Sequence, residues 1–87
     1  MTQETIRSNA VGRLGAARVG VGNIYERTSE GPPPHAGLSA QLFPPDRDAV
    51  TVWPGDVIEV GGVLWTVVSV DKPAGERGSV TLAPAPD

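Results

Sequence analysis

The chain has 87 residues, no cysteine, and a formal net charge of −3 at pH 7. A chain of this length forms one domain with a modest core, which neither a disulfide nor a thiolate metal site reinforces here. The seven basic residues are dispersed and no apolar run approaches the roughly 20 residues of a membrane span, so we expect neither nucleic-acid binding nor membrane insertion.

The N-terminal segment has no apolar stretch of the kind found in secretory signals. Together with the absence of cysteine, this favours a cytoplasmic protein. Residues 2–8 lack an apolar stripe and are expected to form a frayed end or an edge strand. We predict a single β domain over residues 1–87, with loose ends at 1–9 and 84–87.

Eleven glycines and nine prolines, spread in small clusters, favour short strands joined by tight turns over long helices. From Ala17 the apolar residues alternate, with Ala17, Val19 and Val21 on one face. Gly20 and Gly22 then lie on the opposite face, where another group can approach closely.

Residues 22–23 are predicted to form a bulge or turn, after which the chain continues extended to Arg27. The next segment, 27–37, contains three consecutive prolines and is predicted to be a stiff loop. Leu38–Phe43 alternates again, with Leu38, Ala40 and Leu42 on one face. A second loop then leads to a strand over 49–53.

Pro54-Gly55-Asp56 predicts a type II turn, in which proline holds the second position and glycine supplies the positive φ of the third. The two apolar runs Val57–Val60 and Val63–Val70 are separated by Gly61-Gly62, which predicts a β-hairpin with a two-residue loop. Closing this hairpin places Ile58 opposite Trp65.

One face of the predicted hairpin is continuously apolar and comprises Ile58, Val60, Val63, Trp65 and Val67. The other face also contains Val57, Leu64, Val68 and Val70. A strand that is apolar on both sides is expected inside a sandwich or a small closed barrel. With a last strand over 79–83, the sequence predicts an all-β fold: a small barrel or sandwich of five to seven short antiparallel strands.

Candidate reactive residues are few. His35, the one histidine, follows the prolines and is interpreted as a solvated loop residue. Asp46 and Asp48 are interpreted as turn-shaping residues, and Asp56 as a residue whose carboxylate bonds backbone amides. We therefore expect no catalytic residue, no metal site and no cofactor, and an enzyme that uses these carboxylates with His35 is the least favoured reading.

The aromatic residues are the better candidates for a binding surface. Trp65 is expected to be a core anchor, whereas Trp53, at a strand end, could belong to the core or to an interface. If exposed, Trp53 would lie near Phe43 and the proline loop and could contact a partner, because interface hot spots favour large aromatic residues. The predicted interaction residues are Trp53, Phe43, Tyr25, Pro33 and Pro34. Arg18 and Arg27 could flank this surface.

The segment Pro54-Gly55-Asp56, followed by Val60-Gly61-Gly62 and Trp65, resembles a family of small uncharacterised actinobacterial proteins classed as a domain of unknown function. Gly78-Ser79-Val80-Thr81-Leu82 is similar to the closing strand of that family. The resemblance implies no activity. Gly55 to Gly62 also resembles a late strand of forkhead-associated domains, but the phosphothreonine-reading motifs of that family are missing.

Two functions remain open. The first is a non-catalytic β domain that acts through contact with a protein partner or through self-association. The second is a structural subunit of a larger assembly, such as a phage or injection-machine component, in which exposed strand edges pair with neighbours.

Overall fold

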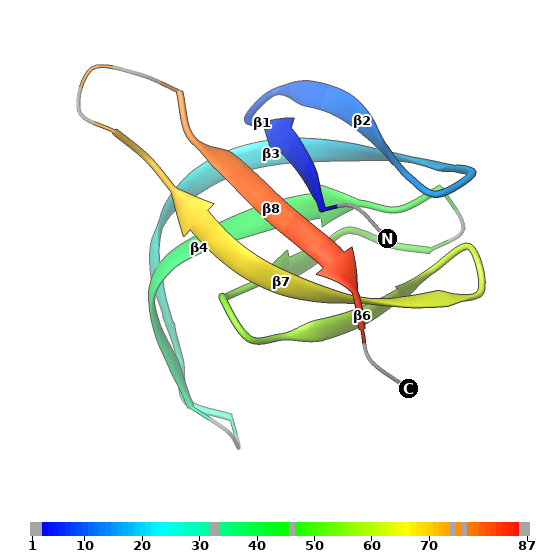
Figure 1. The fold of residues 1–87 in the computed structure, drawn as a ribbon. Helices are drawn as coiled ribbons and strands as arrows, with labels where there is room; N and C mark the ends of the chain where they lie inside the picture. The colour runs from blue at the N-terminus through cyan, green and yellow to red at the C-terminus, as the bar shows by residue number, and fades with distance from the viewer. Residues whose placement is uncertain (1–2, 32–33, 46, 74, 76, 86–87) are drawn as a thin grey trace.

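The computed structural model describes residues 3–31, 34–45, 47–73, 75 and 77–85. These residues form eight strands in two four-stranded antiparallel sheets. In Figure 1 the long strands β3 and β4 lie in one layer and β7 and β8 cross them in the other. The predicted all-β class is confirmed. Of the two predicted architectures the structure shows a sandwich-like arrangement, with eight strands rather than five to seven.

Sheet A has the order β1-β8-β7-β6 and sheet B the order β2-β3-β4-β5. The strands of sheet A are β1 (Glu4–Arg7), β6 (Val57–Val60), β7 (Val63–Asp71) and β8 (Ser79–Pro84). Those of sheet B are β2 (Ala10–Leu14), β3 (Ala17–Ser29), β4 (His35–Phe43) and β5 (Val50–Val52). Each sheet contributes its inward residues to one core.

The chain ends are more ordered than the sequence suggests. Of the two alternatives for residues 2–8, the structure shows the edge strand: β1 pairs with β8, and Ile6 is buried. The loose end predicted for 1–9 is therefore wrong over Glu4–Arg7. Pro84 pairs with Trp65, and the Ala85 N–H donates to the Leu64 carbonyl at 2.9 Å, so the loose end predicted from residue 84 is also wrong over 84–85.

The β6–β7 hairpin has the predicted register, with Val60 opposite Val63 and Ile58 opposite Trp65. Gly61 and Gly62 both have positive φ, which is the conformation that a two-residue type I′ turn requires. This backbone conformation is open to glycine at little cost, and it sets the register of the whole hairpin.

The hairpin lies in a sandwich as expected, but only one of its two apolar faces is buried. Ile58, Val60, Trp65 and Val67 face the core, but Val57, Leu64 and Val68 are exposed, and so is Val63 beside the turn. The structure covers sheet A with sheet B on one side only, so the outer face of the hairpin stays in solvent. Val70 is buried because a register shift between Val67 and Ser69 changes the alternation.

Strands β3 and β4 run further than predicted. The bulge is confirmed as a register shift between Val21 and Ile24. The predicted loop over 27–37 is wrong at both of its ends, because Arg27–Ser29 pairs with His35–Gly37 and extends the ladder. Only the residues between Ser29 and His35 connect the two strands.

The core is built from the inward residues of both sheets, with Val19, Leu42, Val67 and Leu82 among its most buried members. Leu38, Ala40 and Leu42 share the inner face of β4 as predicted, and Leu38 packs against the core from its rim. Among the described residues there is no helix with the length and hydropathy of a membrane span.

Candidate functional site

The outer face of sheet B carries aromatic side chains that the sequence places far apart. Tyr25 on β3 pairs with Ser39 on β4, and Gly20 pairs with Phe43. The neighbouring Ile24 and Leu42 point into the core, so Tyr25 and Phe43 point away from it. Both remain 46% exposed. Two of the predicted interaction residues therefore share one exposed face.

The turn after β5 positions Trp53 and Asp56. The Asp56 N–H donates to the Trp53 carbonyl at 3.1 Å, with Pro54 second in the turn and Gly55 third at positive φ, as the type II prediction requires. The Asp56 carboxylate then accepts the Trp53 N–H through Oδ2 at 2.9 Å. The interpretation of Asp56 as a backbone-bonding residue is confirmed.

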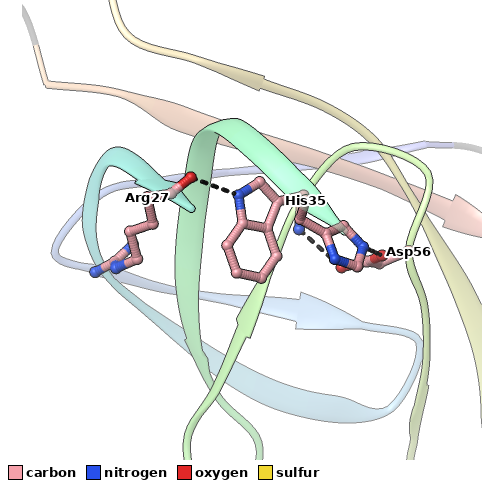
Figure 2. A network of polar contacts seen from close by, with 4 residues as sticks. Arg27, His35 and Asp56 are labelled. Atoms are coloured by element: carbon pink, nitrogen blue, oxygen red, sulfur yellow. Dashed lines mark hydrogen bonds and ion pairs between the residues drawn. The ribbon is translucent and has the colours of Figure 1, made fainter. Parts of the chain in front are cut away.

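His35 completes a polar network with this turn (Figure 2). Its Nε2 lies 2.7 Å from Asp56 Oδ1, and its ring stacks on Trp53 with centroids 4.7 Å apart. The Trp53 indole N–H donates to the Arg27 carbonyl on β3 at 3.3 Å. We call these contacts the His35 network; together they tie the β5–β6 turn to the β3–β4 hairpin.

The prediction that His35 is a solvated loop residue is wrong. The side chain is 22% exposed and bonded, because the β3–β4 ladder continues to the pair Ser29–His35 and brings the imidazole beside the turn. Trp53, for which core and interface were both open, is half-buried on the outer face of sheet B. Asp56, twenty-one positions away from His35, could not be recognised as its partner from spacing.

Arg27 is held on this face by two contacts. Its guanidinium carbon lies 3.5 Å from the centroid of the Tyr25 ring, and its Nη1 donates to the buried Ser39 hydroxyl at 2.6 Å. The Ser39 hydroxyl in turn donates to the Tyr25 carbonyl at 3.0 Å. These two contacts hold the guanidinium group in one orientation.

Phe43 lies across the two glycines for which a close approach was predicted. A Cβ on Gly22 would stand 2.8 Å from Phe43 Cε2, and one on Gly20 would stand 3.6 Å from Phe43 Cβ and 3.9 Å from Val11 Cγ2. Val11, 64% exposed, was missed in the sequence because its position depends on the pairing of β2 with β3. Val11, Gly20 and Phe43 form a continuous line across β2, β3 and β4, which we call the apolar row.

The remaining predicted residues lie elsewhere. Pro34 is exposed immediately before β4, and Pro33 lies outside the described residues. Asp48 is exposed in the connection between β4 and β5, and Asp46 is also outside the described residues. Of the residues considered for catalysis, the structure brings together His35 and Asp56.

A carboxylate that orients an imidazole is one part of a hydrolytic triad, which also needs a nucleophile on the other ring nitrogen. The buried hydroxyl on this face, that of Ser39, is already bonded to Arg27 and Tyr25. Within the part of the chain that the structure describes, no cluster of three His, Asp or Glu residues could hold a metal ion. The contacts of the His35 network connect the β5–β6 turn to the β3–β4 hairpin.

A shallow hollow opens beside Tyr25, between the β1–β2 turn and the β7–β8 connection. Its lining includes Asn9, Asn23, Lys72 and Arg77. These residues come from three separate segments, so no local pattern in the sequence indicates the hollow.

The sequence matches a family of unknown function (DUF6406) over residues 1–85. The chain belongs to this family. The DUF6406 match spans every strand of both sheets, and it agrees with the resemblance to an uncharacterised domain family. No curated protein and no solved structure matches this DUF6406 chain.

The His35 network is expected to stabilise this DUF6406 domain. Replacing Asp56 by alanine leaves the His35 imidazole and the Trp53 N–H without their acceptor. We expect the free energy of unfolding to fall by about 1–2 kcal/mol, measured by urea denaturation. Asp48→Ala removes the same charge from an exposed loop. This control is expected to change the free energy of unfolding by less than about 0.5 kcal/mol. Equal effects of the two substitutions would contradict the assigned role.

Proposed function

We propose that this domain is a non-catalytic protein-binding module whose contact surface is the outer face of sheet B. The observation that carries the proposal is that Tyr25, Phe43 and Val11, all substantially exposed, lie on the same face of sheet B. The half-buried Trp53 extends the same face.

Such a surface suits protein contact for two physical reasons. Aromatic side chains supply a large contact area at little cost in conformational entropy, which is why they dominate interface hot spots. The sheet backbone, the Arg27–Tyr25 contact and the His35 network already hold the face in one shape, so little ordering is lost on binding.

The second candidate, a subunit of a larger assembly, is favoured by a different observation. The outer face of sheet A also exposes apolar side chains, namely Val57, Leu64 and Val68. Two apolar faces on opposite sides of one sandwich allow head-to-tail contact between copies, which closes into rings or continues as filaments.

Site-specific photo-cross-linking tests the proposal. A benzoylphenylalanine placed at Phe43 is expected to give one discrete covalent adduct in cells of the native host. Excess unlabelled wild-type protein should abolish the adduct, whereas excess Tyr25→Ser/Phe43→Ser protein should not. Because both residues are about half exposed, this double variant is expected to stay folded.

The same cross-linker at Val68, on the outer face of sheet A, is the matched control. An adduct with a second protein at position 43 but not at 68 supports the binding module. Adducts between copies of this chain at both positions would favour the assembly instead. Absence of any adduct at position 43 would refute contact through sheet B.

A further inference from the structure

Arg13 and Arg18 lie directly opposite each other in the β2–β3 ladder. Both are exposed, and both point to the outer face of sheet B, because Gly12 faces Ile6 and Val19 is fully buried on the other side. Like charges directly opposed across a ladder have their Cβ atoms about 5 Å apart and destabilise the pairing. We call these two residues the arginine pair.

Nothing in the described structure compensates this repulsion. The ion pairs of the described residues join His35 to Asp56 and Arg47 to Glu59, and neither involves the arginine pair. A domain with a thin core thus keeps an unfavourable contact on the face that also carries its exposed aromatic residues. A carboxylate placed between the two guanidinium groups would turn the repulsion into attraction.

The arginine pair is the immediate neighbour of the apolar row. Arg13 is two residues from Val11 on β2, and Arg18 is two residues from Gly20 on β3, a separation of roughly 7 Å along the strands. A ligand that places a carboxylate on the arginine pair therefore brings its adjacent side chain over Val11 and Phe43.

The other charged side chains on the outer face of sheet B also favour a carboxylate ligand. Arg27 presents a third guanidinium beside Tyr25, and the Asp56 carboxylate is engaged by His35 and the Trp53 N–H. The face is therefore cationic, although the chain as a whole has a net charge of −3.

We propose that this face binds an acidic segment of a partner protein, with a carboxylate bridging Arg13 and Arg18 and an apolar side chain seated on Val11 and Phe43. The inference rests on the proposed function and names the chemistry of its partner. A second copy docked through the same face would bring two arginine pairs together, and a long nucleic acid would meet the net negative charge of the rest of the domain.

The test is a titration of the ¹⁵N-labelled full chain with a synthetic peptide that has a central leucine flanked by two glutamates on each side. We expect saturable shifts at the backbone amides of Val11, Arg13, Arg18, Gly20 and Phe43. A peptide with glutamines in place of glutamates should bind about tenfold more weakly, and one with glycine in place of leucine should also bind more weakly.

The deciding variant is Arg13→Gln/Arg18→Gln. It removes the like-charge contact, so its melting temperature is expected to rise by roughly 2 °C at low salt, while peptide affinity falls about tenfold. Arg7→Gln/Arg47→Gln is the control with the same loss of charge; neither residue lies on a strand of sheet B, so this variant should bind normally. Loss of binding together with a gain in stability identifies a binding site rather than damage to the fold.

Three results would overturn the inference: equal binding of the glutamine peptide, unchanged binding by the Arg13→Gln/Arg18→Gln variant, or preferential binding of an eight-nucleotide oligouridylate by the arginine pair. The cross-linking experiment keeps the two proposals apart. An adduct at position 43 that persists in the arginine variant would support the binding-module proposal and refute the acidic partner. Absence of the adduct would refute both proposals.

Discussion

Trp65→Ala is expected to lower the free energy of unfolding by about 3–5 kcal/mol, the largest effect of any substitution considered. The indole is 4% exposed and packs between the two sheets, in the strand opposite Ile58. Its removal leaves a cavity that the surrounding β ladders cannot close. For a domain of this size the loss is a large part of the total stability, so the variant should be partly unfolded at 37 °C.

The neighbouring residue on the same strand is the matched control. Leu64 is 52% exposed on the outer face of sheet A, and Leu64→Ala should change the free energy of unfolding by less than about 1 kcal/mol. Urea denaturation followed by circular dichroism measures both variants. Similar losses for the two would mean that the hairpin does not face the core as the structure shows.

Gly78→Ala is expected to lower the free energy of unfolding by about 1–3 kcal/mol, although it adds a single methyl group. A Cβ at this position would stand 2.5 Å from the Asp71 carbonyl oxygen and 3.0 Å from two carbon atoms of Ile24. The Asp71 carbonyl belongs to the backbone and cannot rotate away as a flexible side chain would. The Gly78 carbonyl also accepts the Ser8 N–H at 2.8 Å, so any shift is transmitted to the β1–β2 turn.

Gly20→Ala is the control for this substitution. Its Cβ would make ordinary contacts with Phe43 and Val11, and replacing glycine in a strand reduces the entropy of the unfolded chain. We expect unchanged or slightly increased stability in thermal and urea denaturation. If Gly78→Ala proved as stable as Gly20→Ala, the close packing of β7, β8 and β3 at this point would be refuted.

The features that were predicted correctly from the sequence are local ones. The β6–β7 register follows from two glycines, and the turn at Pro54-Gly55 follows from the φ values that those two residues adopt. The inner face of Ala17, Val19 and Val21 follows from the period of a strand. Each of these features depends on the conformation of a few neighbouring residues, so the sequence pattern alone is sufficient to predict it.

The candidate site could be predicted only in part. The aromatic character of Tyr25, Phe43 and Trp53 indicates a contact surface that Arg18 could flank. Nothing in the sequence indicates that Val11 and Arg13 belong to the same face, because that depends on the pairing of β2 with β3. The loop predicted at His35 is wrong because the prolines before it favour an irregular segment, whereas ladder pairing with Ser29 extends β4 to His35 itself. Contacts such as His35–Asp56 depend on which strands become neighbours.

The sequence by itself determined the turns, the strand periodicity and therefore the all-β class, because these depend on backbone conformations that glycine and proline restrict locally. Tertiary structure alone decided that the second apolar face of the hairpin stays exposed, since the sequence already favours the face of Trp65 for the core. The β6–β7 hairpin is apolar on both sides, and only the stacking of sheet B on one of them leaves Val57, Leu64 and Val68 in water. A strand face is buried only where another sheet packs against it, and that sheet is built from distant parts of the chain.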